Sequence, residues 1–270
     1  MLDVKQATKV FSAGTASEHH ALNGLDLHLD EGEFVTIIGS NGAGKSTLFN
    51  AICGNYWLDQ GQIFLDGQDI TFLSEHRRAR QIGRVFQDPM KGTAPHLTIE
   101  ENLALAYTRK DRKPFRSAVR KQEKDLFRTE LEKYHMDLEN RMKTKVGLLS
   151  GGQRQVVTLL MCTLVMPKLL LLDEHTAALD PATAEKVLHL TRQIVAERQI
   201  TCLMVTHNMH QALTLGNRTL MMNAGNIVLD VAGEERAAMS VDDLLEQFAL
   251  RAGKALDNDR ILFSKVETQE

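Results

Sequence analysis

Apolar residues occur along the chain in short runs separated by polar segments, and this pattern predicts an α/β fold. Strand-like patterns fill residues 2–65, where the apolar run at 34–38 leads into a glycine-rich turn. A helix is expected at about 45–53, because Gly54 is a typical helix stop. The N-terminal part of the chain should therefore contribute several strands and one helix.

The later part of the chain alternates between strand and helix patterns. Apolar runs at 169–172 and 201–206 predict two buried strands, and a helical pattern at 181–197 lies between them. A strand, a helix and a strand in succession predict parallel strands in one sheet. The two strand-forming regions are therefore interpreted as parts of one domain.

The middle of the chain is expected to be a mostly helical lobe. Thr98 and Glu101 have the spacing of a capping box, which predicts a helix start at residue 98. Residues 109–116 interrupt this helix. Residues 117–134 are highly charged with apolar residues at helical spacing, which predicts an amphipathic surface helix.

The apolar stretch at 156–172 is too interrupted to span a membrane. Two threonines, Pro167 and Lys168 break it, whereas a span needs about 20 apolar residues in a row. It is interpreted as a buried helix that ends near Pro167, followed by a buried strand at 169–172. Residues 1–7 lack the apolar run of a signal peptide. We therefore expect a protein that does not itself enter the bilayer.

Weaker signals predict the remaining elements. They are a short basic helix after Ser74, a strand at 82–86, a loop at 87–97, a turn at 223–225 and a last helix at 241–250. The polar tail at 254–270 is left open between an ordered and a frayed segment.

Length and composition are those of an ordinary globular protein. The 270 residues allow one large domain or a domain with a small inserted lobe. With 43% apolar and 25% charged residues, the chain is neither disordered nor collagen-like. The net charge of −3 argues against nucleic acid as a partner. Three distant cysteines without Cys-x-x-Cys spacing favour neither zinc nor disulfides and fit the reducing cytosol.

One glycine-rich segment has the sequence of a phosphate-binding loop. Residues 39–46 read Gly-Ser-Asn-Gly-Ala-Gly-Lys-Ser between an expected strand and an expected helix. The glycines let the backbone wrap around phosphate oxygens, and N–H groups at the helix start supply positive potential. Lys45 adds a charge at the outer phosphates, and Ser46 is placed to bind Mg²⁺. A glycine-rich turn with an incidental lysine is the alternative, which the strand and helix context disfavours.

Two adjacent carboxylates follow the apolar strand at 169–172. Ligands bind at the carboxyl ends of strands in open parallel sheets, so Asp173 and Glu174 are placed for chemistry. Asp173 is expected to hold Mg²⁺ directly or through water, and Glu174 to accept a proton from an attacking water. Taken alone, the pair would be interpreted as capping or solvated charges. Together with the Lys45 loop, it indicates nucleotide hydrolysis.

A second helix start with anion-binding character lies at Ser150. Residues 149–153 read Leu-Ser-Gly-Gly-Gln, and Ser150 and Gln153 have capping-box spacing. A Ser-Gly-Gly helix start exposes N–H groups and is an anion site, so one nucleotide could use both helix starts. An ordinary serine N-cap is an equally open interpretation.

The order of these motifs resembles the ATP-binding subunits of ABC transporters over about residues 2–229. The phosphate loop, Leu-Ser-Gly-Gly-Gln, Asp173-Glu174, the Ala-Leu-Asp at 178–180 and a lone His207 after an apolar strand follow that family's order. The resemblance implies two copies paired head to tail. ATP would lie between the phosphate loop of one copy and residues 150–153 of the other.

The resemblance also implies a fold and a domain plan. The fold class would be α/β, a phosphate-loop NTPase of ABC type. Its core would be a mostly parallel sheet with N-terminal antiparallel strands and an inserted helical lobe. A single domain would cover residues 1–253, with the lobe at about 98–165 and a tail at 254–270.

The resemblance further implies roles for single residues. Gln87 would sense Mg²⁺ and the attacking water and link to the membrane subunit. His207 would contact the γ-phosphate and help to position the water. Asp180 would communicate between the two sites, although an Asp before a proline is also an ordinary helix start. Phe11 would stack on adenine through its π-face.

These considerations define the expected site. Catalysis is assigned to Glu174, His207, Lys45 and Gln87, and Mg²⁺ binding to Ser46, Gln87 and Asp173. Nucleotide binding is assigned to Phe11, Gly39, Ser40, Asn41, Gly42, Ala43, Gly44, Lys45, Ser46, Thr47, Ser150, Gly151, Gly152, Gln153 and Asp180.

One residue departs from the family pattern. His175 stands where many members of the family carry proline. The carboxylates before it are intact, so the departure marks a subfamily rather than a loss of hydrolysis. Residues 173–180 look similar to ATPases of bacterial import systems whose binding proteins have been tied to aromatic amino acids.

The leading hypothesis is an ATPase subunit that powers a separate transmembrane permease from the cytoplasmic face of the membrane. We expect import of a small solute such as an amino acid, with an extracytoplasmic substrate-binding protein in the same system. The alternative is a soluble ABC-type assembly or scaffold factor that uses ATP without transport. The nucleotide residues do not separate the two hypotheses, whereas a permease-binding surface at about 87–98 would.

Overall fold

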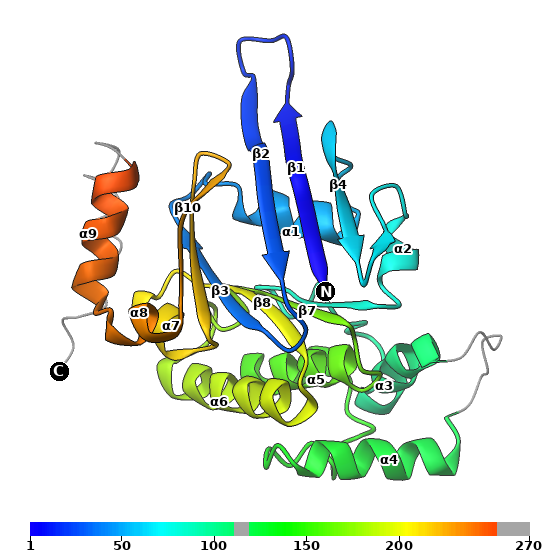
Figure 1. Ribbon diagram of the computed structural model, residues 1–270. Helices are drawn as coiled ribbons and strands as arrows, with labels where there is room; N and C mark the ends of the chain where they lie inside the picture. Colours follow the sequence, from blue (N-terminus) through cyan, green and yellow to red (C-terminus); the bar gives the residue numbers. More distant parts are fainter. Residues whose placement is uncertain (111–118, 253–270) are drawn as a thin grey trace. The chain divides into compact units, whose positions relative to one another are not determined.

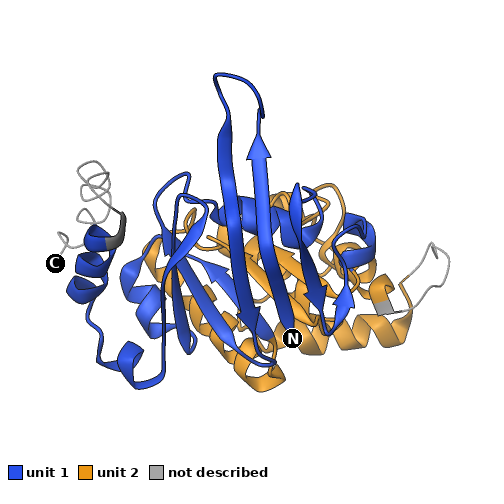
Figure 2. Cartoon of the chain, turned by 45° about the horizontal axis from the view of Figure 1, so that its top comes forward, with its two compact units in different colours: residues 1–79, 201–270 blue, residues 80–200 orange. Residues whose placement is uncertain are grey.

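The computed structural model describes residues 1–110 and 119–252, which fall into two units (Figure 2). Unit 1 comprises residues 1–79 and the chain from residue 201 onward, and unit 2 comprises residues 80–200. The expected tail at 254–270 and most of the expected break at 109–116 lie outside the described residues.

Unit 1 contains an antiparallel sheet with the strand order β2-β1-β4-β5 (Figure 1). Its strands are β1 (Leu2–Phe11), β2 (His19–Leu29), β4 (Gln60–Leu65) and β5 (Gln68–Asp69). Val4 on β1 lies opposite Leu27 and Ile63 on its two neighbours, and all three side chains are buried. Apolar residues at alternate positions thus give the sheet one buried face. The expected N-terminal antiparallel strands are confirmed.

The second sheet of unit 1 is mostly parallel. Its strands are β3 (Phe34–Gly39), β8 (Thr201–Val205), β9 (Arg218–Asn223) and β10 (Asn226–Ala232). β3 runs parallel to both β8 and β9, and β10 is antiparallel to β9. All residues of β3 are buried, which is typical of a strand covered on both faces. The turn expected at 223–225 joins β9 to β10 through Ala224 and Gly225, both at positive φ.

Five helices belong to the described part of unit 1. They are α1 (Lys45–Cys53), α2 (Glu75–Arg78), α7 (Met209–Thr214), α8 (Gly233–Ala238) and α9 (Val241–Ala252). α1 has the expected bounds, and the N–H of Gly54, at φ 86°, donates to the carbonyl of Asn50. α9 confirms the expected last helix. Its Leu244 and Phe248 pack in a core cluster with Ile38 of β3.

Two buried arginines satisfy helix ends in unit 1. Arg78, on α2, donates from Nη1 to the carbonyl of Ala51 in the last turn of α1, at 2.7 Å. Arg236, on α8, donates to the carbonyls of Ala212 and Leu215 at the end of α7, at 2.9 and 2.5 Å. Carbonyls in the last turn of a helix have no helical partner, so these contacts stabilise both helices. Burial lowers the pKa of both arginines.

Unit 2 holds a parallel strand pair and a group of helices. β6 (Ile82–Val85) runs parallel to β7 (Leu169–Asp173). The helices are α3 (Ile99–Tyr107), η1 (Thr108–Lys110), α4 (Lys121–Glu132), η2 (Val146–Leu148), α5 (Gly151–Thr163) and α6 (Pro181–Arg198), where η marks a 3₁₀-helix. α3, α4 and α5 fall within the lobe expected at about 98–165, whose limits remain a prediction.

The expected capping boxes of unit 2 are confirmed. The Thr98 hydroxyl accepts from the Glu101 N–H, and the Glu101 carboxylate accepts from the Thr98 N–H. Ser150 and Gln153 form the same reciprocal pair at the start of α5. Each pair satisfies N–H groups that a helix start leaves without a partner.

The end of α5 differs from the expectation. The helix ends at Thr163 and does not reach Pro167. Arg198 donates to the Thr163 carbonyl at 2.7 Å, and Arg109 donates to the Cys162 carbonyl at 3.2 Å, so distant guanidinium groups satisfy the last turn. Within the described ranges, no helix combines the length and apolar character needed to cross a membrane.

The start of α4 also differs from the expectation. The helix begins at Lys121, because the Glu123 carboxylate accepts from the N–H of Arg120 at 2.8 Å and fixes the first turn there. Val119 therefore precedes the helix, and Tyr134 lies beyond its last residue. Residues 117 and 118 of the expected helix lie outside the described residues.

Candidate functional site

The glycine-rich loop connects β3 to α1, as expected. Gly39 ends the strand at φ 152°, and Gly44 precedes the helix at φ 103°. A Cβ atom on Gly39 would lie 2.2 Å from the carbonyl oxygen of Met222, and one on Gly44 would lie 2.3 Å from that of Ala21. Neither position has room for a side chain, so the path of the loop depends on these two glycines.

Lys45 begins α1, and its ammonium group folds back onto the loop. Nζ donates to the carbonyl oxygens of Gly39 at 2.7 Å and Ser40 at 2.9 Å, and the residue is only 6% exposed. α1 has no side-chain N-cap, while Ser46 is exposed and Thr47 is partly buried in its first turn. First-turn N–H groups and the helix dipole favour an anion at such a start. The loop therefore presents a positively polarised cradle.

The turn between β9 and β10 supports the loop. The Gly225 N–H donates to the Ala43 carbonyl at 3.0 Å, and the Gly225 carbonyl accepts from the Asn23 N–H at 3.1 Å. Sequence reasoning located this turn without linking it to the site, because nothing in a turn sequence identifies its distant partner. The loop is thus bonded to the turn after β9, and that turn is bonded to β2.

His207 lies at the same sheet edge as the glycine-rich loop. β3 and β8 are parallel neighbours, so the loop after β3 and His207 after β8 share the carboxyl edge. Asn208 caps α7 by accepting from the Gln211 N–H at 2.9 Å, and the Thr206 hydroxyl donates to the Gln211 side chain at 2.9 Å. The exposed His207 is therefore held between two anchored residues.

A hollow of 570 Å³ with aromatic walls lies beside the end of β1 in unit 1. Phe11 lies edge-on to Tyr56 with 5.3 Å between ring centroids, and Lys9 Nζ lies 5.7 Å from the Phe11 centroid. Lys9 also hydrogen-bonds Asp59 at 2.8 Å, which lowers the pKa of that carboxyl group. Aromatic faces and edges of this kind suit a heterocyclic base. The role of Phe11 stays a prediction, and the sequence analysis did not name its neighbour Tyr56.

Asp173 forms an ion pair that sequence reasoning missed. Arg84 on β6 places Nη2 at 2.7 Å from Asp173 Oδ2, and the two side chains are 11% and 16% exposed. The same guanidinium lies 4.7 Å from the Phe86 ring centroid. The sequence did contain a signal for this ion pair: Arg84 stands inside an apolar strand, and a buried charge requires a partner.

Glu174 follows β7 with a left-handed backbone, at φ 47°. This conformation is uncommon for a residue with a side chain and persists where the surroundings impose it, often at functional sites. Gln87 is exposed and follows β6 closely. Because β6 and β7 are parallel, unit 2 gathers Gln87, Asp173 and Glu174 at one sheet edge.

The start of α5 has little room for a side chain at Gly152. A Cβ atom on Gly152 would lie 2.1 Å from Thr183 Cγ2, and one on Gly151 would lie 3.2 Å from Leu179 Cδ2. Thr183 belongs to the first turn of α6, where its N–H donates to Asp180 Oδ1 at 3.0 Å. Hydrogen bonds from Thr183 lower the pKa of Asp180. The helix starts at Ser150 and Asp180 therefore lie against each other within unit 2.

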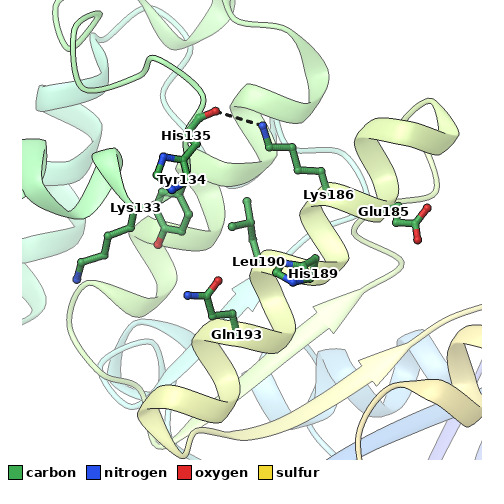
Figure 3. A pocket seen from close by; sticks show the side chains of 8 residues that line it. All are labelled: Lys133, Tyr134, His135, Glu185, Lys186, His189, Leu190 and Gln193. Atoms are coloured by element: carbon green, nitrogen blue, oxygen red, sulfur yellow. Dashed lines mark hydrogen bonds between the residues drawn. The ribbon is translucent and has the colours of Figure 1, made fainter.

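A second hollow, of 540 Å³, lies outside the predicted set (Figure 3). Residues 133–135 after α4 line one side, and α6 from Glu185 to Gln193 lines the other. Lys186 Nζ donates to the carbonyl of His135 at 3.2 Å and joins the two sides. In the part of the chain that the structure describes, no cluster of three or more His, Cys, Asp or Glu side chains is placed to hold a metal ion.

Comparison with known proteins extends over most of the chain. A family model described as ABC transporter matches residues 22–177, which include the glycine-rich loop, Ser150 and Glu174. A tyrosine transport ATP-binding protein of Clostridioides difficile is 45% identical over 248 residues, which are 92% of this chain and 98% of that protein. A thiamine import ATP-binding protein of Photorhabdus laumondii is 36% identical over 78% of this chain and 85% of that protein.

Solved structures share the fold. A dimeric ATP-binding cassette in a post-hydrolysis state, bound to ADP and phosphate, has a TM-score of 0.74 and 29% identity, covering 86% of this chain and 98% of its own. A nucleotide-free cassette from an ABC transporter has a TM-score of 0.73 and 26% identity, covering 91% of this chain and 95% of its own. These similarities confirm the expected fold class.

Proposed function

The chain belongs to the ABC transporter family and is an ATPase that drives transport. We propose that it energises uptake of an amino acid through a separate permease. The observation that carries the proposal is the 45% identity to a tyrosine transport ATP-binding protein over 92% of this chain. An aromatic amino acid, with tyrosine as the first to test, is the proposed solute.

We propose that ATP binds with its phosphates in the loop at residues 39–46. The glycine backbone and the start of α1 supply N–H groups, and Lys45 would exchange its loop carbonyls for phosphate oxygens. Phe11 and Tyr56 would receive the adenine.

The residues proposed for Mg²⁺ fit that ion in their chemistry. Ser46, Gln87 and Asp173 offer hydroxyl, amide and carboxylate oxygens, and Mg²⁺ is commonly held by few protein oxygens together with substrate phosphates. When bound, Mg²⁺ would supply positive charge that offsets the charge of the phosphates.

Glu174 is the proposed general base. Its carboxylate would take a proton from the water that attacks the γ-phosphate, while Lys45 and His207 stabilise charge on the phosphate oxygens. Gln87 would orient the same water and relay its presence to the permease. The left-handed backbone at Glu174 supports this role, because such strain is commonly stored at functional sites.

The proposed assembly is a head-to-tail dimer of this chain. The phosphate loop of one copy would face residues 150–153 of its partner across the nucleotide, with Asp180 next to that helix start. The related ADP-bound cassette is dimeric, which supports a dimer of this chain. ATP would favour the closed dimer over the open one, and this difference in affinity would move the permease.

The same proposal locates the protein in the cell. The dimer would bind a permease at the cytoplasmic face of the membrane, and an extracytoplasmic binding protein would deliver the solute. Residues 1–253 would act as one ATPase domain, in which residues 98–165 form the inserted lobe.

Replacing Glu174 with Gln tests the proposed chemistry. We expect ATP binding to persist while turnover falls by about 10²- to 10⁴-fold, the usual contribution of a general base. Glu185→Gln, which removes an exposed carboxylate of the same unit, serves as the control and should keep the wild-type rate. Full turnover in Glu174→Gln would exclude this residue as the base.

The same two variants, co-purified with the membrane protein that they bind and placed in vesicles together with the extracytoplasmic binding protein, test the transport step. We expect ATP-dependent uptake of labelled tyrosine with Glu185→Gln and none with Glu174→Gln. Uptake of thiamine or methionine instead would correct the solute. A purely soluble complex would favour the scaffold hypothesis over transport.

A further inference from the structure

His175 occupies the second position of a tight turn that carries the proposed base. The carbonyl of Glu174 accepts from the N–H of Ala177 at 3.0 Å, which closes a four-residue turn. Proline is favoured at the second position of such turns, because its ring fixes φ near the required value. With histidine there, the backbone of this turn lacks that restraint.

The His175 side chain is anchored inside unit 2. The residue is 1% exposed, and Nε2 lies 3.1 Å from the hydroxyl of Thr191 on α6. That hydroxyl donates its single proton to the carbonyl of Val187 at 2.8 Å. Because the contact with the Val187 carbonyl is the shorter of the two, we assign the hydroxyl proton to it, so that Thr191 accepts from His175 and the imidazole proton lies on Nε2.

We propose that His175 is a positioning residue for hydrolysis: its Nε2–H···Oγ1 bond to Thr191 fixes the turn that holds Glu174. The bond ties the second residue of the turn to α6, whose start is fixed separately by Asp180. The segment from Glu174 to Asp180 is thus restrained at both ends. The His175 side chain thus restrains the turn through a hydrogen bond, whereas a proline would restrain it by fixing the backbone φ angle.

Packing alone does not explain a histidine at this position. His175 Nδ1 is buried without a hydrogen-bond partner in the described part of the chain, which an apolar side chain would avoid.

Thr191→Val and Thr191→Ser form a matched pair for testing this role. Valine keeps the shape and removes the acceptor, whereas serine keeps the hydroxyl. We expect Thr191→Val to lower kcat for ATP hydrolysis by about ten- to a hundredfold, the usual effect of a misplaced catalytic group. The affinity for ATP should not change, and Thr191→Ser should hydrolyse ATP at nearly the wild-type rate.

Rescue by proline separates positioning from simple stability. The double variant His175→Pro/Thr191→Val no longer needs the side-chain bond and should regain the wild-type kcat. Equal kcat in the valine and serine variants would overturn the proposal, as would a proline double variant with wild-type Tm and no recovery. If Thr191→Val does not fold, ¹⁵N NMR of wild-type His175 decides, since a ring that exchanges between its two tautomers would exclude a fixed bond between Nε2 and Thr191.

This inference rests on the proposed role of Glu174, and the two fail in different ways. Retained turnover in Glu174→Gln would show that Glu174 is not the general base. An inactive Glu174→Gln together with wild-type kcat in Thr191→Val would leave the base in place and overturn only the role of His175.

Discussion

The two glycine-rich helix starts look alike in sequence and are built differently. The start of α1 follows Gly44, which offers no side-chain cap, and Lys45 folds over the loop. The start of α5 carries a capping box in which Ser150 and Gln153 satisfy each other's N–H groups. The first start leaves N–H groups for a ligand, whereas the second is closed by its own side chains.

The glycines of the two starts also serve different purposes. Gly39 and Gly44 have positive φ, and a side chain on either would meet backbone carbonyls. Gly152 has ordinary helical geometry, and its Cβ would meet only the methyl group of Thr183. The first loop therefore needs glycine because of its backbone conformation and the backbone next to it. The second helix start needs glycine because α6 packs closely against it.

The N–H groups at the second start are held by Ser150 and Gln153 through two hydrogen bonds of 3.3 Å. Phosphate oxygens accept from the same kind of donor. In the proposed dimer, α1 would bind the phosphates within its own copy, and α5 would offer its N–H groups to the nucleotide of the other copy.

Gly152→Ala should have a larger effect on stability than the loss of either serine at these helix starts. We expect a loss of roughly 1–2 kcal/mol, because overpacking costs about 1–3 kcal/mol and the better helix propensity of alanine returns up to about 1. Urea denaturation measures the difference.

Thr183→Ser provides the rescue, since it removes the methyl group that the new Cβ would meet. In that background, Gly152→Ala should cost nothing. Gly44→Ala is the contrasting variant, because its clash is with the Ala21 carbonyl and no side-chain change relieves it. An unrelieved loss in Gly152→Ala/Thr183→Ser would contradict the contact with Thr183 as the reason for glycine at position 152.

Ser150→Ala and Ser46→Ala should differ in their effect on the free energy of unfolding, by less than Gly152→Ala changes it. Loss of the Ser150 cap should lower the free energy of unfolding by about 1 kcal/mol. Ser46 is exposed at a start without a side-chain cap, so its replacement should change stability by less than about 0.5 kcal/mol while weakening Mg²⁺-dependent ATP binding. Equal losses in the two variants would contradict the difference in capping.

Features set by neighbours in the chain were predictable from the sequence. α1 has the expected bounds because Lys45 follows the loop and Gly54 adopts the left-handed conformation that ends it. The starts at Thr98 and Ser150 were equally clear, since capping partners lie three residues apart.

Features set by distant partners were not predictable. Arg236 stands in Glu-Glu-Arg-Ala-Ala, which has the composition of a solvated surface, yet it is buried against the end of α7. α7 and α8 are too short to show helical periodicity and were missed for this reason. Arg84 meets Asp173, 89 positions away, only because β6 and β7 pair.

Mixing two inactive variants tests most directly whether two copies share each nucleotide. Lys45→Ala removes the lysine of the phosphate loop, and Ser150→Glu places a negative charge at the start of α5. A head-to-tail pair of one copy of each would contain one intact site. We predict that each variant alone is inactive and that an equal mixture recovers about a quarter of the wild-type ATPase rate, because half of the randomly formed dimers are mixed. No recovery at any mixing ratio, with both variants folded, would contradict the shared site.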